Sequence, residues 1–385
     1  METSLKRSAT ISRVRELQLP WTEDIELEYD VLREIGSGDY GKVSLAKHKS
    51  TSTEVALKAV PKATTPLRDF LIEFHYSYFL SPHPCILDTY DVSFETPNFY
   101  YFAQEVAPLG DLWQVIEQEG GLEEAELKIV LQQIVPALEF MHSKDLVHRD
   151  VRAENILLFT RDLRKVKLTD FGLTRRAGTL VKKRTRSLPT CPPEIWEMVN
   201  LEGYHVELGS DVWQIAMFIF IALTARFPWD KADITDVRFN EFIEWQKRKT
   251  TRTPREFKRF TPRLLRMFRR LMEQKPSKRY EITEVNKYYA DRWMPVRQGS
   301  RFDLSIEDSP GQSGANPNLL SPTYQAEFLS AQRKNSYKVE WNIASLKGNN
   351  AFLQIGLKNK PGLHGIPAKR TTRHSALFIC PHNHW

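Results

Sequence analysis

The stretch HRDVRAEN, residues 148–155, decides the fold. It separates Asp150 from Asn155 in the arrangement H-R-D-x-x-x-x-N, which is typical of a catalytic loop for phosphoryl transfer. In such a loop the aspartate accepts or orients a substrate hydroxyl, and the asparagine is an oxygen ligand for a metal ion. Asp150 is therefore the candidate catalytic carboxylate, and Asn155 is a candidate catalytic residue and metal ligand.

A second carboxylate follows in KLTDFG, residues 167–172. Asp170 lies 20 residues after Asp150 in this motif. Phosphoryl transfer depends mainly on positioning and charge neutralisation, and hard oxygen ligands are those that Mg²⁺ prefers. Asp170 and Asn155 are therefore expected to hold Mg²⁺ that bridges the phosphates of ATP.

A glycine-rich segment, GSGDYGKV at residues 36–43, precedes both motifs. Its glycines Gly36, Gly38 and Gly41 let backbone amides approach phosphate oxygens that larger side chains would obstruct. A glycine-rich hairpin turn can produce the same pattern. The segment lies between two predicted strands, whereas a dinucleotide-binding fold needs a helix directly after the loop.

A lysine and a glutamate complete the set of charged candidates. Lys58 ends the strand-like run VALK, 17 residues after Gly41, and Glu73 lies among large apolar residues in FLIEFHY. An unpaired carboxylate is costly to bury, so Glu73 is expected to pair with Lys58. Lys58 would then grip the α- and β-phosphates of ATP. Four motifs in this order indicate a protein kinase.

Hydrophobic patterning around these motifs predicts an α+β fold in two lobes. Runs rich in β-branched and aliphatic residues, which predict strands, lie at 29–36, 42–49, 54–60 and 98–106. Runs with helical spacing or a buried apolar character lie at 66–80, 125–143, 215–225, 234–249 and 262–274. We expect a small antiparallel-sheet N-lobe with one helix, residues 28–104, and a large helical C-lobe, residues 108–294.

The two ends of the chain differ from this domain in composition. Residues 1–27 are polar and are expected to be flexible. Residues 295–385 form a low-complexity tail, of which 297–385 carries 11 Lys and Arg against 5 Asp and Glu. We expect the tail to be disordered, although a basic extension could contact acidic partners, RNA or anionic lipid.

Bulk composition narrows the class of protein. The net charge is +7, and the chain has 3 cysteines that form no CxxC pair, which favours a reducing compartment over a disulfide framework. No apolar run reaches the ~18 residues that span a bilayer. We expect a cytoplasmic monomer, with nuclear entry an open alternative, and no specific nucleic-acid partner.

The chain from about residue 28 to 294 resembles eukaryotic protein kinases, and most of all the SH3-binding-domain kinase family of serine/threonine kinases. That resemblance rests on LVHRDVRAENILLF, KLTDFGLTRR, FPWD at 227–230 and FNEFIEWQ before RRLMEQKPSKR. It implies the bilobal protein-kinase fold, ATP and Mg²⁺ as cofactors, and protein substrates. The family name also implies SH3-domain partners, but the isolated prolines of the tail form no P-x-x-P motif.

The same resemblance implies the nucleotide contacts. Gln104 would be the gatekeeper, backbone groups of Glu105 and Ala107 would meet adenine, and Asp111 would lie near the ribose. The remaining residues expected to bind the nucleotide are Ile35, Gly36, Gly38, Gly41, Val43, Ala56, Lys58, Glu73 and Asp170. Asp211 would brace the catalytic loop, and Glu194 would pair with Arg279.

Two alternatives concern activity and specificity. Thr190, Pro192 and Ala216 depart from the usual kinase pattern and leave a weakly active or inactive scaffold, a pseudokinase, as an alternative. Arg152-Ala153 stands where serine/threonine kinases usually have Lys-Pro, a pair that resembles some tyrosine kinases. Arg152 still retains the positive charge that bridges the γ-phosphate and substrate hydroxyl.

The segment after KLTDFG helps to decide between these alternatives. Ser187, four residues after Lys183, matches the hydroxyl residue of serine/threonine kinases, so serine/threonine specificity is favoured over tyrosine. The segment also carries six basic residues and no acid, at Arg175, Arg176, Lys182, Lys183, Arg184 and Arg186. This loop either needs a phosphate on Thr179 or Thr185, bound by Arg149, or favours acidic substrates, or is only an exposed charged loop.

Overall fold

The computed structural model describes residues 19–38, 41–183, 189–198 and 202–295, and two short strands beyond them. Those strands, β12 (Phe352–Gln354) and β13 (Leu377–Ile379), pair antiparallel in a separate unit of the chain. The predictions for Thr185 and Ser187, and most of those for the tail, lie outside the described residues.

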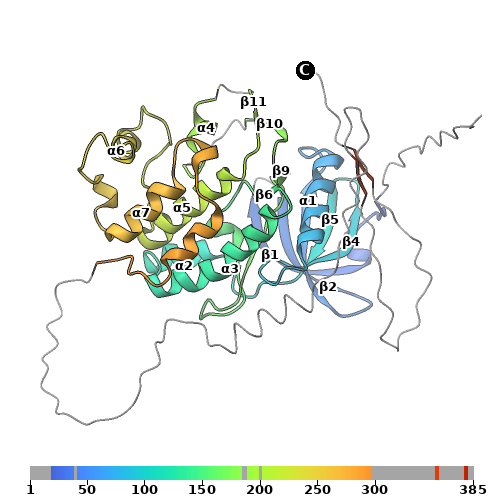
Figure 1. Cartoon of the computed structure of the whole chain (residues 1–385). Helices are drawn as coiled ribbons and strands as arrows, with labels where there is room; N and C mark the ends of the chain where they lie inside the picture. The colour runs from blue at the N-terminus through green and yellow to red at the C-terminus, as the bar shows by residue number, and fades with distance from the viewer. Residues whose placement is uncertain are drawn as a thin grey trace, which may run out of the picture. The chain divides into compact units, whose positions relative to one another are not determined.

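The N-lobe is a five-stranded antiparallel sheet in the order β1-β2-β3-β5-β4. Figure 1 shows this sheet in blue, beside α1. Its strands are β1 (Tyr29–Gly38), β2 (Gly41–His48), β3 (Glu54–Pro61), β4 (Thr89–Glu95) and β5 (Phe99–Gln104). The first three are the consecutive strands that the sequence predicts. Strand β4 was not predicted, because its Tyr90 and Val92 are exposed at the sheet edge and its apolar pattern is weak.

Helix α1 (Leu67–Leu80) packs on this sheet through aromatic side chains. The ring of Phe70 lies 4.9 Å from that of Tyr100, and Phe74 lies 5.8 Å from Phe102. Leu19 joins the same cluster and is buried. Leu19 is therefore packed on the N-lobe, where it fills an apolar site beside these aromatic rings, whereas most of residues 20–27 are exposed.

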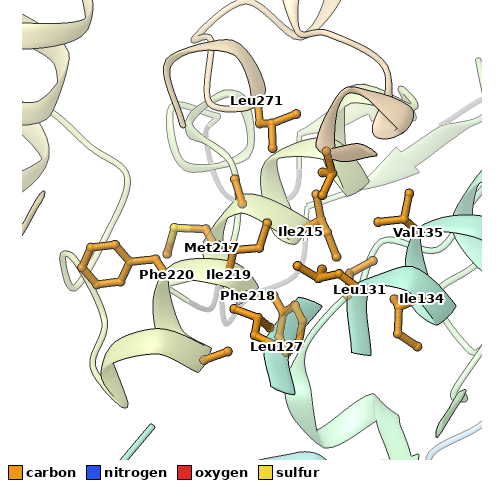
Figure 2. Packing of buried hydrophobic residues seen from close by; sticks show 14 of the residues in the cluster. Leu127, Leu131, Ile134, Val135, Ile215, Met217, Phe218, Ile219, Phe220 and Leu271 are labelled. Atoms are coloured by element: carbon orange, nitrogen blue, oxygen red, sulfur yellow. The ribbon is translucent and has the colours of Figure 1, made fainter. Parts of the chain in front are cut away.

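The C-lobe is helical around one large apolar core. Its longer helices are α2 (Leu112–Glu119), α3 (Glu124–His142), α5 (Gly209–Thr224), α6 (Val237–Gln246) and α7 (Pro262–Leu271). Every residue of α5 from Ser210 onward is buried, which explains its unbroken apolar run. Figure 2 shows Leu131 of α3, Phe218 of α5 and Leu271 of α7 in this core.

Short elements connect the helical core to the front of the lobe. They are β6 (Leu146–Val147), β7 (Ile156–Leu158), β8 (Val166–Leu168), β9 (Arg175–Arg176), β10 (Leu180–Lys182), α4 (Pro193–Trp196) and β11 (Gly203–His205). The pairs β6–β9, β7–β8 and β10–β11 are antiparallel. The α+β fold in two lobes is thus confirmed. No helix among the described residues is long and apolar enough to cross a bilayer.

Candidate active site

The register of the N-lobe sheet sets the positions of the predicted nucleotide residues. Val43 on β2 lies opposite Gly36 on one side and Lys58 on the other. Ala56 on β3 lies opposite Gln104 at the end of β5. Ile35 precedes Gly36 on β1 and is partly buried. The residues that the sequence predicts to bind the nucleotide therefore occupy neighbouring positions of one sheet, on β1, β2, β3 and β5.

The position of Gly41 has no room for a side chain. Its φ angle is +132°, a region that L side chains rarely adopt, and a Cβ atom there would lie 2.1 Å from the backbone oxygen of Ala59. Gly38 ends β1, and a Cβ atom at Gly38 would meet open space. Residues 39 and 40 of the loop lie outside the described chain. Gly41 thus holds the loop close to β3.

Lys58 lies between two carboxylates. Its Nζ donates a hydrogen bond to Oε1 of Glu73 on α1 and lies 3.6 Å from Oδ1 of Asp170. Burial lowers the pKa of the Lys58 ammonium, but the charges of Asp170 and Glu73 outweigh it, so the pKa lies above its usual value. Lys58 is a fixed cation, and the predicted pair with Glu73 is present.

Two hydrogen bonds join the catalytic loop to the segment before Asp170. The Thr169 backbone amide donates to the Asn155 carbonyl at 2.9 Å, and Nε2 of His148 donates to the Thr169 carbonyl at 3.1 Å. Nδ1 of His148 accepts from the Asp150 amide, so the neutral tautomer with its proton on Nε2 fits both contacts. The loop that carries Asp150 is thereby fastened to the segment that carries Asp170.

Asp150 and Asn155 interact directly. Nδ2 of Asn155 donates to the Asp150 carbonyl at 2.8 Å and to Oδ2 of Asp150 at 2.9 Å. Burial and the negative charge of Asp170 raise the pKa of Asp150, although the positive charge of Arg152 acts against them. For Asp170, burial raises the pKa, but the charges of Lys58 and His148 and the hydrogen bond from the Gly172 amide together outweigh it, so this carboxyl has a pKa below its usual value.

These two shifts give the carboxylates different chemical properties. Asp170 stays ionised, which suits a cation ligand, whereas Asp150 is closer to the range of a proton acceptor. Oδ1 of Asn155 receives no hydrogen bond from the described residues, so it is an available oxygen donor. An aspartate and an amide oxygen fit Mg²⁺, which takes few protein ligands and completes its shell with water and phosphate oxygens.

Arg152 has a partner that the sequence did not suggest. Its guanidinium bonds to the carboxylate of Glu154, two residues along the same loop. Both side chains remain about one third exposed. The positive charge of Arg152 acts on Asp150, and the Glu154 carboxylate partly neutralises it.

Two residues of α5 anchor the catalytic loop through hydrogen bonds. Asp211, fully buried, accepts hydrogen bonds from the amides of His148 at 2.8 Å and Arg149 at 2.7 Å, and from Nε2 of His142 at 2.9 Å. The bracing role predicted for Asp211 is confirmed. Gln214, one helical turn later, was not predicted. It accepts from the Val151 amide and donates to the Arg149 carbonyl.

Gln104 and Glu105, at the end of β5, both make side-chain hydrogen bonds. Nε2 of Gln104 donates to Oγ1 of Thr89 at 3.0 Å, which fixes the orientation of this buried amide. The Glu105 side chain accepts from the Asp88 amide and from Lys167, and its backbone amide donates to the Asp88 carbonyl. Of the two Glu105 backbone groups, the amide is therefore already bonded, and the carbonyl is the one left to meet a ligand. Lys167 is a site neighbour that sequence reasoning missed.

The remaining predicted contacts lie just beyond this point. Ala107 is partly buried in the connection that follows β5. Asp111 caps α2, because its Oδ1 accepts from the Gln114 amide at 3.2 Å and its Oδ2 from the Gln114 side chain at 2.8 Å. The sequence suggested only a ribose contact for Asp111, whereas the structure shows its carboxylate as the cap of α2.

The basic segment that follows is less free than its composition suggests. Arg175 bonds to the carbonyls of Gly172 and Thr174, and Arg176 bonds to Asp145 at 3.3 Å. Lys183 donates to two carbonyl oxygens, one of them at 2.7 Å. Thr179 is partly buried, and Arg184 and Arg186 lie outside the described residues. Self-repulsion is thus reduced by internal partners.

The end of this segment is held to the C-lobe. Arg279 donates to both carboxylate oxygens of Glu194, at 2.7 and 2.6 Å, so the predicted pair is confirmed as a bidentate contact. Pro192, one of the departures from the usual pattern, precedes α4 in extended backbone. Its ring is buried and takes the N-cap position of α4, where the helix makes no demand on its missing amide.

Comparison with known proteins gives one family match and three relatives. A model of the protein kinase domain matches residues 29–290. The zebrafish serine/threonine-protein kinase SBK1 is 40% identical over 98% of this chain and 100% of that protein. Mouse SBK1 is 44% identical over 69% of this chain and 64% of the mouse protein. The fruit-fly serine/threonine-protein kinase meng-po is 42% identical over 73% of this chain and 63% of the fly protein.

Proposed function

We propose how the site works from one premise: this chain belongs to the protein kinase family and is a serine/threonine-protein kinase. The family implies that ATP and protein substrates bind. The proposal is that Asp150 accepts the proton of a serine or threonine hydroxyl while Lys58 and Asp170 hold the phosphates in place. These residues would then mainly position ATP and the substrate hydroxyl for the reaction.

One observation carries the proposal. The backbone of Thr169 bonds to both Asn155 and His148, so the segment with Asp170 and the loop with Asp150 are fixed against each other. Lys58 lies 3.6 Å from Asp170 in the same arrangement. A scaffold without catalysis has no need to keep a buried lysine, two aspartates and their supports in register. The pseudokinase alternative is therefore less well supported.

We propose that Asp170 and Asn155 hold Mg²⁺. When bound, the ion would neutralise charge on the phosphate oxygens. The pKa of Asp170 is lowered against the effect of burial by Lys58 together with His148 and the Gly172 amide, so that carboxylate stays ionised without the ion. Glu73 keeps Lys58 oriented, so that Lys58 can turn from Asp170 to the α- and β-phosphates.

The nucleotide would lie against the N-lobe sheet. We propose that the backbone of the glycine-rich segment faces the phosphates and that the Glu105 carbonyl and Ala107 backbone face adenine. Asp111 would approach the ribose from the start of α2. The side chains and glycines that complete this surface are Ile35, Gly36, Gly38, Gly41, Val43, Ala56 and Gln104.

Arg152 is proposed to bridge the γ-phosphate and the substrate hydroxyl. Its pair with Glu154 keeps the guanidinium beside Asp150, whose pKa it lowers. A preference for acidic substrates stays a proposal. Fewer basic side chains of the segment are available to bind a substrate than the sequence suggested. Of the basic segment, Lys182 is exposed, while Arg175, Arg176 and Lys183 have partners.

Other proposals rest on the sequence alone. They are a monomeric state, residence in the cytoplasm with nuclear entry open, and a domain over 28–294 that the tail follows. SH3-domain partners remain a proposal from the family name, and the missing P-x-x-P motif weighs against it.

The test is phosphate transfer by the full chain with Mg²⁺ and labelled ATP on arrays of serine, threonine and tyrosine peptides. Acidic and basic flanking sequences would be compared, and Asp170→Ala would serve as the control. We expect labelling of serine and threonine that the control lacks. ATP binding without transfer above the control, in protein expressed in animal cells, would contradict the proposed reaction.

A further inference from the structure

The guanidinium of Arg149 makes two hydrogen bonds to other residues of the protein. Its Nη1 donates to the Leu173 carbonyl at 2.8 Å, and its Nη2 donates to the hydroxyl of Tyr204 at 2.7 Å. The guanidinium carbon lies 5.6 Å from the centre of the Tyr204 ring. Tyr204 thus contributes both a hydrogen-bond acceptor and a ring face to this arginine.

The backbone of Arg149 is coupled directly to Asp150, the next residue. Arg149 has a φ angle of +71°, which is uncommon for a residue with a side chain and persists only where surrounding contacts hold it. Its amide donates to Asp211, and its carbonyl accepts from Gln214. A side chain that fixes Arg149 therefore helps to fix the carboxylate that we assign to catalysis.

Tyr204 also joins two segments that are distant in sequence. It lies on β11, where its backbone pairs with Val181 of β10. The contacts continue on both sides, from the Gly178 amide to the Val206 carbonyl at 2.8 Å and from the Lys183 amide to the Glu202 carbonyl at 2.9 Å. The segment after KLTDFG is thereby held along residues 178–183, with Tyr204 in the middle of the ladder.

In many kinases a phosphate added to this segment is the partner that orders it, through new bonds to arginine. Here the described contacts fill that role without a phosphate. Arg149 bonds to a phenol and a carbonyl, and neighbouring Arg175 bonds to two carbonyls and lies 3.9 Å from Asp69. Arg149 and Arg175 therefore have partners already.

We propose that Tyr204 is a positioning residue that holds Arg149, and through it Asp150, so that transfer does not require a phosphate on the segment after KLTDFG. This inference rests on the proposed function, because it concerns the rate of the same reaction. It gives β11 a role in positioning Arg149, which the sequence of this strand, GYH, does not indicate by itself.

The experiment uses the full chain treated with a phosphatase and verified by mass spectrometry as unphosphorylated. Wild type, Tyr204→Phe and Tyr280→Phe would be compared for kcat and for KM of ATP. Tyr280 is a matched control, because its ring lies 4.7 Å from the Arg270 guanidinium, far along the chain from the site. Asp170→Ala gives the background without transfer.

We expect unphosphorylated wild type and Tyr280→Phe to transfer phosphate at equal rates. Tyr204→Phe keeps the ring but loses the hydroxyl that accepts from Nη2 of Arg149. We expect kcat to fall roughly tenfold with KM for ATP unchanged, measured at a temperature where both proteins are fully folded. A purely structural role for the hydroxyl would lower the melting temperature and leave kcat alone.

Two outcomes would overturn the inference while leaving the proposed function intact. One is an unchanged kcat in Tyr204→Phe. The other is wild-type transfer that disappears on dephosphorylation and returns when the phosphate is restored. If neither the phosphorylated nor the unphosphorylated wild type exceeds Asp170→Ala, the proposed function itself fails.

Discussion

Nζ of Lys58 lies 3.6 Å from Oδ1 of Asp170 while it donates a hydrogen bond to Glu73. One ammonium therefore serves two carboxylates that come from α1 and from the segment after β8. The side chains of Lys58 and Glu73 are 12% and 8% exposed, so neither charge can be compensated by water. The position of Lys58 depends on which carboxylate attracts it more strongly.

This balance predicts the effect of Glu73→Gln. Without the Glu73 charge, Lys58 is drawn to Asp170 and away from the phosphates. We expect kcat/KM for ATP to fall roughly 10- to 100-fold. Glu95→Gln is the matched control, because Glu95 pairs with Lys62 at 2.7 Å in the same lobe. Equal kinetics for the two variants would contradict the assigned role of Glu73.

The raised pKa of Asp150 predicts a pH dependence of kcat. Burial and the charge of Asp170 favour the protonated carboxyl, which cannot accept a proton from the substrate. The rate should therefore rise with pH through a pKa above the ordinary value of about 4. Because the pKa of Asp170 is lowered, that group does not produce this limb. The measurement is kcat at saturating ATP against pH, with Asp150→Asn as the control that lacks the limb.

Much of the fold and the site follows from local sequence, and several of the contacts that it did not predict join residues far apart in the chain. Strand and helix periods predicted β1, β2, β3 and α1, and the motifs predicted Lys58 and Asp170 because they carry the chemistry themselves. The contact of Lys167 with Glu105 joins residues 62 positions apart, and that of Arg149 with Tyr204 joins residues 55 apart. No local period encodes such pairs.

Residues 19–27 illustrate the same limit. Their polar composition predicted a flexible segment, yet Leu19 is buried beside α1 and the Trp21 backbone bridges to Glu95. A single apolar side chain in a polar stretch has no periodic signal. It becomes informative only once the aromatic cluster of the N-lobe is assembled and offers a site for it.

Arg152 provides a test of how much its charge and its shape matter. We expect Arg152→Ala to lower kcat roughly 30- to 100-fold, because the positive charge beside Asp150 is lost. Arg152→Lys should stay within about fivefold of wild type, since an ammonium supplies the same charge from a narrower head. Arg164→Ala, at an exposed ion pair with Asp162, is the control. A lysine variant as weak as the alanine variant would show that the guanidinium geometry is required.

Asp211 is expected to support stability as well as catalysis. In Asp211→Asn an amide nitrogen or an uncharged oxygen replaces an acceptor for the His148 and Arg149 amides, inside a fully buried site. We expect the free energy of unfolding to fall by about 3 kcal/mol, measured by urea denaturation at neutral pH. Asp233→Asn, at an exposed carboxylate that accepts from the Thr235 amide, should change it by less than about 1 kcal/mol.

The cost of Asp211→Asn should also depend on pH. Burial raises the pKa of Asp211, but hydrogen bonding from His142 and the loop amides outweighs it, so the folded-state pKa lies below the unfolded value. A depressed carboxyl pKa stabilises the fold above the unfolded pKa of about 4, and that stabilisation is lost as the pH falls through the folded pKa. The difference in unfolding free energy between wild type and variant should therefore shrink in acid. A difference that stays constant from neutral pH to pH values below about 3 would show that the ionised form of Asp211 is not what anchors the loop.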